Sequence, residues 1–431
     1  MSQIIARAGA SLRGRIGVPG DKSISHRALL LGCLAHGRSE IHGFLPSADC
    51  MATLGCIRQL GIVVDRESNH TVTVHGRGLH GLQRPRGPLD CLRSGTTMRL
   101  LAGMLAGQSF DSVLTGDPQL LRRPMGRIAE PLRRMEIHVD TTDGHGPLTI
   151  HGGSVRGCEH RLPVASAQVK SAILLAGLYA PDPTVVHQPG PARDHTERML
   201  AAMGADIKVA GLTVTLTPRP SPLHPFDFAI PGDISSASFP LVAALLLPGS
   251  RVTLERVGVN PTRTGLLHVL QAMGAQIAID SRRQDGGEPA ADVTARSSSL
   301  RGVGVSGNTV VRMIDEFPLL AVAATQARGT TLVRDAAELR VKETDRIAVI
   351  AVELSKMGAQ IEPRRDGFAV AGPTPLLGAA VDSHGDHRIA MALAVAGLLA
   401  EGETIIYGAD CTADSFPGFV ETMQQIGAQM D

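Results

Sequence analysis

Strongly apolar stretches recur along the chain, and each follows a short polar segment rich in Gly, Ser or Asp. The six stretches read ALLLGCLAHG, MRLLAGMLAG, AILLAGLYAP, FPLVAALLLPG, FPLLAVAATQARG and IAMALAVAGLLAEG. A helix that is apolar on all sides is buried, whereas a surface helix is amphipathic. The pattern therefore predicts six buried helices, whose Ala and Gly residues suit close packing.

A second repeated piece, an amphipathic helix that leads into a short strand, follows each apolar stretch. Its copies lie at 57–65, 132–140, 200–210, 270–280, 354–363 and 423–430. Five of the six helices end at Gly, which readily adopts a left-handed backbone, and Glu136 takes its place in the second copy. The copies lie about seventy residues apart, so six α/β units account for the whole chain.

The composition fits a globular protein of two or more domains, with 431 residues and 43% hydrophobic content. The net charge of +1 gives no bulk basicity for nucleic acid or an anionic membrane. No apolar run reaches the length of a membrane span, and we interpret the segment 1–18 as a first strand rather than a targeting signal. The six cysteines lack the paired spacing of a zinc site or a redox dithiol, so we expect reduced thiols and a cytoplasmic location.

One polar segment carries more charge than the others. Residues 18–32 read VPGDKSISHRALLLG, in which a Pro-Gly turn leads into the first apolar stretch. The first turn of a helix offers free N–H groups and the positive end of the helix dipole, and Lys22, Ser23 and Arg27 crowd around that turn. The segment predicts an anion site. The alternative is a capped helix with a solvated, charged end.

The polar starts of the six buried helices occupy the same place in each repeat. They lie at 20–27, 93–99, 166–171, 232–238, 313–317 and 384–388. If the buried helices run side by side, their N-termini point the same way and several positive dipole ends converge on one cleft. The start GDISSAS copies GDKSISHR but lacks its Lys and Arg, which indicates that the fold does not need those cations.

Basic residues also gather near the other helix starts and tight turns. They are Arg99, Arg123, Arg193, Lys342, Arg346 and Arg388. A surface salt bridge is the ordinary role of any one of them, but a guanidinium group also matches phosphate and carboxylate bidentately. Together, in a near-neutral chain, they predict a cationic cleft for small, highly charged anions.

Three acidic residues stand among these cations: Asp315, Glu343 and Asp386. Each has a structural alternative: a helix N-cap for Asp315, an internal ion pair for Glu343 and a positioning role for Asp386. A carboxylate among cations has a lowered pKa and is ionised, so it can accept a proton. The chain shows no GxSxG or GxGxxG motif and no metal-ligand spacing, so we expect neither a metal nor a cofactor.

These segments, in this order, resemble the 5-enolpyruvylshikimate-3-phosphate synthase family. The resemblance is carried by GDKSISHR, SGTTMRL, LRRPMGRI, SAQVKSAILLAGL, RDHTERML, MIDEFPLLAVAA, RVKETDRI, GDHRIAMALAV and SFPGF. It implies an α/β (α+β) fold, a two-domain inside-out α/β barrel of six βαβαββ units with buried parallel helices, three units per domain. One domain spans 20–239 and the other 1–19 plus 240–431, with the active site in the interdomain cleft.

The resemblance also implies a reaction. The enolpyruvyl group of phosphoenolpyruvate moves to the 5-hydroxyl of shikimate 3-phosphate, and phosphate leaves through a tetrahedral intermediate. The reaction belongs to chorismate and aromatic amino-acid biosynthesis. Each substrate carries a phosphate and a carboxylate, which accounts for the cations. We expect a monomer whose partners are these two small anions, with no nucleic acid or membrane involved.

Site residues follow from the matched motifs. The resemblance implies that shikimate 3-phosphate is bound by Lys22, Ser23, Arg27, Ser166, Ala167, Gln168, Arg193, Asp315 and Lys342. It implies that phosphoenolpyruvate is bound by Lys22, Gly95, Arg123, Gln168, Arg346 and Arg388. Asp315 matches the base that takes the 5-hydroxyl proton, Glu343 the proton shuttle to the methylene carbon, and Lys22 assists with charge and protonation.

The chain departs from the common family pattern at several places. Arg93 stands where many members have Asn, and this extra cation lies near Gly95. Asp414 stands where many have Lys, so we leave it out of the site. Ala167 replaces a Ser, so only its backbone contributes. Gly95 indicates room for the inhibitor glyphosate whereas Leu100 replaces a Pro of many sensitive members, so sensitivity stays open.

Two other functions compete with this interpretation. UDP-N-acetylglucosamine enolpyruvyltransferase shares the fold and the phosphoenolpyruvate chemistry, but that family has Asn after the motif Lys and a reactive Cys in a mobile loop. Here Ser23 follows Lys22, and the corresponding loop at 115–126 has no Cys. A non-catalytic anion-binding repeat protein would need the cations but not the acids.

Overall fold

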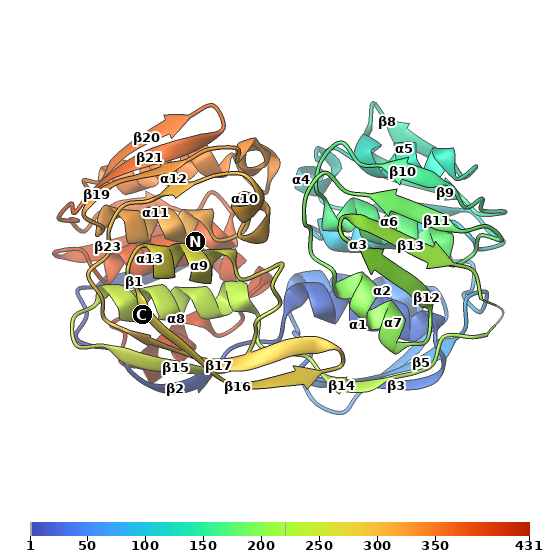
Figure 1. Cartoon of the computed structure of the whole chain (residues 1–431), viewed down its shortest axis with the longest axis horizontal. Coiled ribbons are helices and arrows are strands. Elements are labelled where there is room, and N and C mark those ends of the chain that lie inside the picture. The colour runs from blue at the N-terminus through green and yellow to red at the C-terminus, as the bar shows by residue number, and fades with distance from the viewer. Residues whose placement is uncertain (1, 220) are drawn as a thin grey trace. The chain divides into compact units, whose positions relative to one another are not determined.

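The computed structural model describes residues 2–219 and 221–431. The chain forms two compact units, shown in Figure 1. The inserted unit comprises residues 20–230 and 284–288, and the terminal unit comprises 1–19, 231–283 and 289–431. The sequence placed the second boundary at 239/240 and assigned 284–288 to the other domain; the structure differs on both. Residues 231–239 belong to the terminal unit because Asp233 caps α8 (Ile234–Leu246) and Phe239 lies in that unit's core.

Six almost fully buried helices form the interiors of the two units. They are α1 (Lys22–Leu34), α3 (Gly95–Leu105) and α6 (Ala167–Gly177) in the inserted unit, and α8, α11 (Phe317–Thr325) and α13 (His387–Gly397) in the terminal unit. These helices are the six apolar stretches of the sequence. Five begin at an Asp or Ser whose side chain accepts a backbone N–H of the first turn. The polar starts are therefore helix caps.

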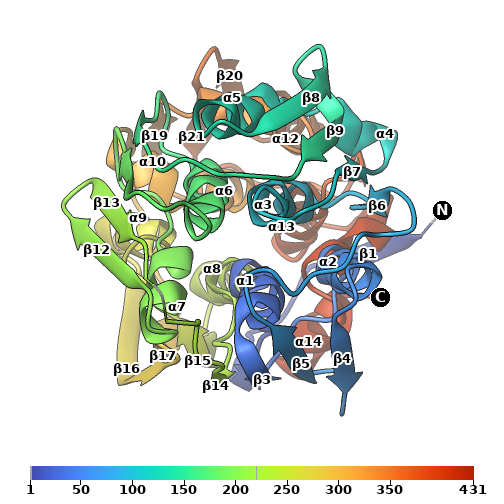
Figure 2. The same ribbon diagram turned by 90° about the vertical axis from the view of Figure 1, so that its right-hand side faces the viewer.

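The helices α3 and α6 run parallel in the inserted unit. Near their starts, Gln168 donates to Thr96. Further along, Gly103 lies so close to Ala172 that a Cβ there would meet its carbonyl oxygen at 2.1 Å, and near the ends Gly107 lies against Tyr179. The contacts advance along both chains together, so both N-termini lie at the same end. Figure 2 looks nearly along α1, α3 and α6, which lie inside the strands of this unit.

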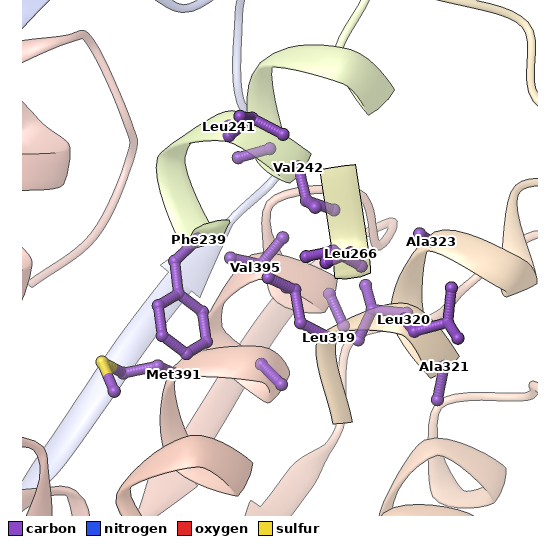
Figure 3. Packing of buried hydrophobic residues seen from close by; sticks show 14 of the residues in the cluster. Phe239, Leu241, Val242, Leu266, Leu319, Leu320, Ala321, Ala323, Met391 and Val395 are labelled. Atoms are coloured by element: carbon purple, nitrogen blue, oxygen red, sulfur yellow. The ribbon is translucent and has the colours of Figure 1, made fainter. Parts of the chain in front are cut away.

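The terminal unit repeats this arrangement with α8, α11 and α13. Figure 3 shows Phe239 and Val242 of α8 with Leu319 of α11 and Met391 and Val395 of α13 in one apolar cluster. At the polar ends, Ser235 donates to Glu316 at the start of α11. Small and branched aliphatic side chains fill these interiors, which is why a chain without Trp still has two large cores.

Six amphipathic helices cover the cores. They are α2 (Ala48–Gln59), α5 (Gly126–Arg134), α7 (His195–Ala202), α9 (Gly265–Ala272), α12 (Arg346–Lys356) and α14 (Phe419–Gln425). The residue two positions after the end of each of these helices has a left-handed backbone conformation. It is Gly after five of them and Glu136, at φ 65°, after α5. The second copy thus ends its helix as the other five do.

Within the described residues, each unit has three sheets. In the inserted unit their strand orders are β14-β3-β5-β4, β6-β7-β9-β8 and β10-β11-β13-β12. The strands are β3 (His36–His42), β4 (Val63–Arg66), β5 (Thr71–Arg77), β6 (Leu89–Asp90), β7 (Ser112–Thr115), β8 (His138–Thr142), β9 (His145–His151), β10 (Glu159–Arg161), β11 (Thr184–His187), β12 (Asp206–Ala210), β13 (Thr213–Thr217) and β14 (Asp227–Ala229).

The terminal unit has the orders β16-β17-β15-β2, β18-β19-β21-β20 and β1-β23-β22. The strands are β1 (Gln3–Arg7), β2 (Arg13–Gly17), β15 (Arg251–Gly258), β16 (Gln276–Asp285), β17 (Glu288–Arg296), β18 (Gly304–Val305), β19 (Gly329–Val333), β20 (Gln360–Arg364), β21 (Gly367–Gly372), β22 (Ala380–Asp382) and β23 (Glu403–Tyr407). Segment 1–18 therefore holds two strands, β1 and β2, rather than one. They belong to different sheets, which the sequence did not separate.

Four short helical segments complete the description: α4 (Pro118–Leu121), α10 (Asn308–Arg312), η1 (Ala337–Val341) and η2 (Ala409–Asp414). In the part of the chain that the structure describes, the sheets stay separate and none closes into a barrel. None of the described helices has the length and apolarity that crossing a membrane requires.

Candidate functional site

The start of α1 places the first two predicted residues. Asp21 caps the helix by accepting from Ile24 N, so the helix begins at Lys22 itself. Lys22 Nζ lies 2.9 Å from the carboxylate of Asp49 on α2, and both side chains are mostly buried. Arg193 donates to Ser23 Oγ at 3.2 Å. Two cations and a hydroxyl thus gather at the positive end of a helix.

Arg27 lies one turn further along α1 and is only 3% exposed. Its Nε donates to Thr196 Oγ1 at 2.7 Å, its Nη2 to Ser171 Oγ at 2.8 Å, and its Nη1 to the carbonyl of Ser23 at 2.9 Å. Burial lowers the pKa of Arg27 to about 10, against a raising effect of Glu197. The group is therefore still a cation at neutral pH, and its bonding partners are uncharged.

The start of α6 places the SAQ segment beside α3. Ser166 caps α6, and Ala167 opens it with a backbone N–H in the first turn. Gln168 accepts from Arg99 Nη1 and donates to Thr96 Oγ1 at 3.0 Å. Arg99 was noted as a cation in the sequence but was not included among the site residues. Its contact with Gln168 places its guanidinium group beside the N-terminus of α6.

Gly95, the first residue of α3, leaves room for two guanidinium groups. A Cβ at this position would lie 3.1 Å from Arg123 Nη1 and 3.2 Å from Arg99 Nη1. Ser94 caps the same helix, so both cations lie near a helix N-terminus. The nearby Arg93 is half exposed and pairs with Asp117 at 3.1 Å. Its extra charge is therefore balanced by a local carboxylate.

In the terminal unit, Asp315 lies between two arginines. Its Oδ1 is 3.3 Å from Arg346 Nη1, and its Oδ2 is 3.5 Å from Arg388 Nη2. The N-cap of α11 is Glu316 rather than Asp315, so the capping alternative for Asp315 is wrong. The carboxylate is 13% exposed by side chain and adjoins the start of a buried helix.

Arg346 joins three carboxylates. Besides Asp315 it binds Glu343 Oε2 through Nη2 at 2.6 Å and Asp386 Oδ2 through Nε at 2.8 Å. Burial alone would lower the pKa of Arg346, but Asp386, Glu343 and Asp315 raise it above its ordinary value. Asp386 also caps α13 through Arg388 N. The ion-pair alternative for Glu343 and the positioning role for Asp386 both describe contacts that the structure contains.

Lys342 lies directly after η1 and one residue before Glu343. Burial lowers the pKa of Lys342, and the carboxylate of Asp315 opposes that shift. The terminal unit therefore gathers three cations, Lys342, Arg346 and Arg388, with three carboxylates.

The structure thus gathers the predicted residues into two clusters, one in each unit. The first, which we call the phosphate cluster after the ligand that the sequence leads us to expect, lies in the inserted unit and holds Lys22, Ser23, Arg27, Gly95, Arg123, Ser166, Ala167, Gln168 and Arg193. The acid cluster of the terminal unit holds Asp315, Lys342, Glu343, Arg346 and Arg388. Sequence reasoning missed Asp49, Ser171 and Thr196, which contact the phosphate cluster. Thr196 stands in the motif RDHTERML, which was its only signal.

Among the described residues, two groups of side chains have the composition of metal ligands, and both lie outside the predicted site residues. His138, Asp140 and His151 share the surface of β8 and β9, and Asp194, His195 and Glu288 adjoin α7. In each, histidine and carboxylate already pair: His151 with Asp140 at 2.9 Å and His195 with Glu288 at 2.8 Å. Neither group shares a residue with the two clusters.

Comparison with known proteins gives consistent matches along the whole chain. The model of the family EPSP synthase (3-phosphoshikimate 1-carboxyvinyltransferase) matches residues 6–423. A protein of that second name from Herpetosiphon aurantiacus is 52% identical over 430 residues, covering 99% of each chain. Another from Pelotomaculum thermopropionicum is 53% identical over 418 residues, covering 96% of each.

Solved structures agree with this result. EPSP synthase from Acinetobacter baumannii has a TM-score of 0.90 and 44% identity, with 100% of this chain and 99% of that chain covered. The enolpyruvyl transferase NikO from Streptomyces tendae has a TM-score of 0.82 at 21% identity over 100% of this chain and 98% of that one, and so shares the fold. The family model and the relatives all carry the same name, and the chain belongs to the EPSP synthase (3-phosphoshikimate 1-carboxyvinyltransferase) family.

Proposed function

We propose that the phosphate cluster and the acid cluster contribute to one active site for the family's reaction. That reaction transfers the enolpyruvyl group of phosphoenolpyruvate to shikimate 3-phosphate, and the chain is an enzyme of this activity. One observation supports the proposal most strongly: Asp315 lies between Arg346 and Arg388, which stabilise its ionised form. A carboxylate held in this way can accept the proton of a substrate hydroxyl.

Shikimate 3-phosphate needs several cations and hydrogen-bond donors at its phosphate. We assign its phosphate to Ser23, Arg27, the α6 start and Lys342. The α6 start combines the Ser166 hydroxyl, the Ala167 backbone and the Gln168 amide. Lys22 and Arg193 add positive charge beside the same ligand, and Asp315 binds its ring hydroxyls.

Phosphoenolpyruvate is a second small anion, and a second group of cations suits it. We assign it to Gly95, Arg123, Arg346 and Arg388, together with Lys22 and Gln168 from the first group. Gly95 supports this assignment because its missing side chain leaves the tips of Arg123 and Arg99 beside the N-terminus of α3.

The proton steps then follow from the acids. Asp315 takes the 5-hydroxyl proton as that oxygen bonds to C2 of phosphoenolpyruvate, and the methylene carbon gains a proton by way of Glu343 and Lys22. Phosphate then leaves C2 while one proton of the new methyl group returns to the protein, and this elimination forms the enol ether of the product. Arg346 holds Asp315 and Glu343 at once and so fixes the two proton-transfer groups relative to each other.

We further propose that the protein works as a monomer in the cytoplasm, without a cofactor. The six cysteines are unpaired, and five of them are buried, which suits a reducing compartment.

The test is phosphate release with phosphoenolpyruvate and each of two acceptors, shikimate 3-phosphate and UDP-N-acetylglucosamine. We expect release with the first only; release with the second would favour the related transferase. Asp315→Asn should lower turnover by about a thousandfold or more, because an amide cannot act as the base. Affinity for shikimate 3-phosphate and folding should change far less.

The control for Asp315→Asn is Glu362→Gln, which removes an exposed carboxylate of the same unit. It should leave turnover unchanged. If Asp315→Asn turns over like the unaltered protein, the assignment of the base is wrong. If the unaltered protein binds shikimate 3-phosphate but never releases phosphate, the binding-protein alternative is correct.

A further inference from the structure

The side chains that hold Arg27 have no assigned role. Ser171 on α6 and Thr196 on α7 present two hydroxyl oxygens to one edge of its guanidinium group, the edge formed by Nε and Nη2. The two oxygens are 2.7 Å apart and bond each other. All three residues are buried, at 3% exposure or less. The pair therefore occupies the place of a bidentate carboxylate without carrying its charge.

The lack of charge in this pair is unusual for a buried arginine, because an isolated buried charge is costly and is normally paired. No carboxylate of the described residues lies within ion-pair distance of the Arg27 guanidinium group. The nearest acid in sequence to the pair, Glu197, instead contacts the buried Lys170 at 2.6 Å. The carboxylate beside Thr196 is thus occupied by another cation, and the charge of Arg27 is left uncompensated by direct contact.

We propose that Ser171 and Thr196 form a neutral cradle that fixes the orientation of Arg27 while preserving its full positive charge for the anionic ligand shikimate 3-phosphate. Both are positioning residues, since they act through Arg27. This inference rests on the proposed function of Arg27 as a shikimate 3-phosphate ligand. The cradle also ties α1, which carries Ser23, to α6, which Ser166 caps, and to α7, which begins two residues after Arg193.

The first test removes one hydroxyl without changing side-chain volume. Thr196→Val should weaken binding of shikimate 3-phosphate, measured by titration calorimetry, by about tenfold or more, because the buried Nε–H loses its acceptor. The KM for phosphoenolpyruvate and kcat should each change by less than about threefold. Thr196→Ser keeps the hydroxyl and should restore the affinity. Thr184→Val is the matched control, because Thr184 is a fully buried threonine of the same unit whose hydroxyl has no partner.

The second test separates charge from geometry. Thr196→Asp and Thr196→Asn have nearly the same shape, and both offer an oxygen to Arg27, but only the first offers a negative charge. If the cradle must be neutral, Thr196→Asp should bind shikimate 3-phosphate at least tenfold more weakly than Thr196→Asn. Equal affinities for the two would overturn the role of charge. Ser171→Ala is measured in parallel and should resemble Thr196→Val, which keeps the proposal testable if one variant does not fold.

The outcomes also separate this proposal from the proposed function. If the unaltered protein gives no binding heat with shikimate 3-phosphate, the function of the phosphate cluster fails. If the unaltered protein binds shikimate 3-phosphate and Thr196→Val binds it equally well, only the proposed role of Ser171 and Thr196 is wrong. Equal losses of affinity for both substrates, or an equal loss in Thr184→Val, would show that the hydroxyl is merely structural.

Discussion

Arg27 of the inserted unit and Arg346 of the terminal unit are both buried, at 3% and 1% exposure, but they are held by opposite chemistry. Arg27 donates to two hydroxyls and a carbonyl, and burial lowers its pKa. Arg346 contacts three carboxylates, which raise its pKa. The difference teaches that a buried arginine can serve as a binding charge in one place and as the centre of an ion-pair network in another.

The partners decide which role is available. A guanidinium group that already contacts several carboxylates attracts a further anion less strongly than one with neutral partners, but it fixes the positions of those carboxylates. A guanidinium group held by neutral oxygens keeps its attraction for phosphate. Arg27 is therefore suited mainly to bind an anion, whereas Arg346 is suited to hold Asp315 and Glu343 in place in addition to its proposed part in the phosphoenolpyruvate site.

The same substitution made at both arginines gives the strongest contrast. Arg346→Met should destabilise folding by about 3–5 kcal/mol, because it removes the cation that the fully buried Asp386 contacts at 2.8 Å and one ion pair each of Asp315 and Glu343. Turnover should be lost as well, since both proton-transfer residues lose their shared partner. Urea denaturation measures the change in the free energy of unfolding.

A double variant checks the cause of that loss. Arg346→Met combined with Asp386→Asn also removes the charge of Asp386, the most buried of the three carboxylates, and should recover part of the stability, while turnover stays lost. A single variant that unfolds at the same urea concentration as the unaltered protein would mean that the network does not stabilise the terminal unit.

Arg27→Met should have a smaller effect on stability and a large effect on binding. After the substitution, the hydroxyls of Ser171 and Thr196 still bond each other, so we expect a loss of about 1–2 kcal/mol in the free energy of unfolding. Affinity for shikimate 3-phosphate should fall by about a hundredfold, because a buried cation and its phosphate contact are removed. Calorimetry measures the affinity and urea denaturation measures the free energy of unfolding, both on the same sample. If Arg27→Met destabilises folding as much as Arg346→Met does, the two arginines do not differ in role as we propose.

Much of the fold could be predicted because the signals are local and repeated. Buried helices, polar caps and glycine ends each follow from a few neighbouring residues, and Glu136 shows that the repeat tolerates a change of residue while keeping the left-handed backbone. The domain boundary was predicted less well, because Asp233 and Phe239 are assigned to the terminal unit by packing that no local pattern reveals.

The site residues were found through their charge, whereas the partners that define each role were not. Ser171 and Thr196 look like ordinary small residues of buried or amphipathic helices, and Asp386 lies 40 residues from the Arg346 that it binds. The sequence therefore predicted both Arg27 and Arg346 as anion ligands, the first for shikimate 3-phosphate and the second for phosphoenolpyruvate. Only tertiary contacts separate the arginine with neutral partners from the one with three carboxylates.

The smallest expected effect extends the comparison to two other cations of the inserted unit, Arg99 and Arg123, whose guanidinium tips lie beside Gly95. Gly95→Ala would place a methyl group 3.1 Å from Arg123 Nη1 and 3.2 Å from Arg99 Nη1, so both tips must shift by a few tenths of an ångström. We expect the KM for phosphoenolpyruvate to rise several-fold, by about 1 kcal/mol, with affinity for shikimate 3-phosphate nearly unchanged because Arg27 is untouched. Gly55→Ala on α2 is the control, since a Cβ there meets nothing within 4 Å. An equal loss of affinity for both substrates in Gly95→Ala would show that the two groups of cations do not bind separate ligands.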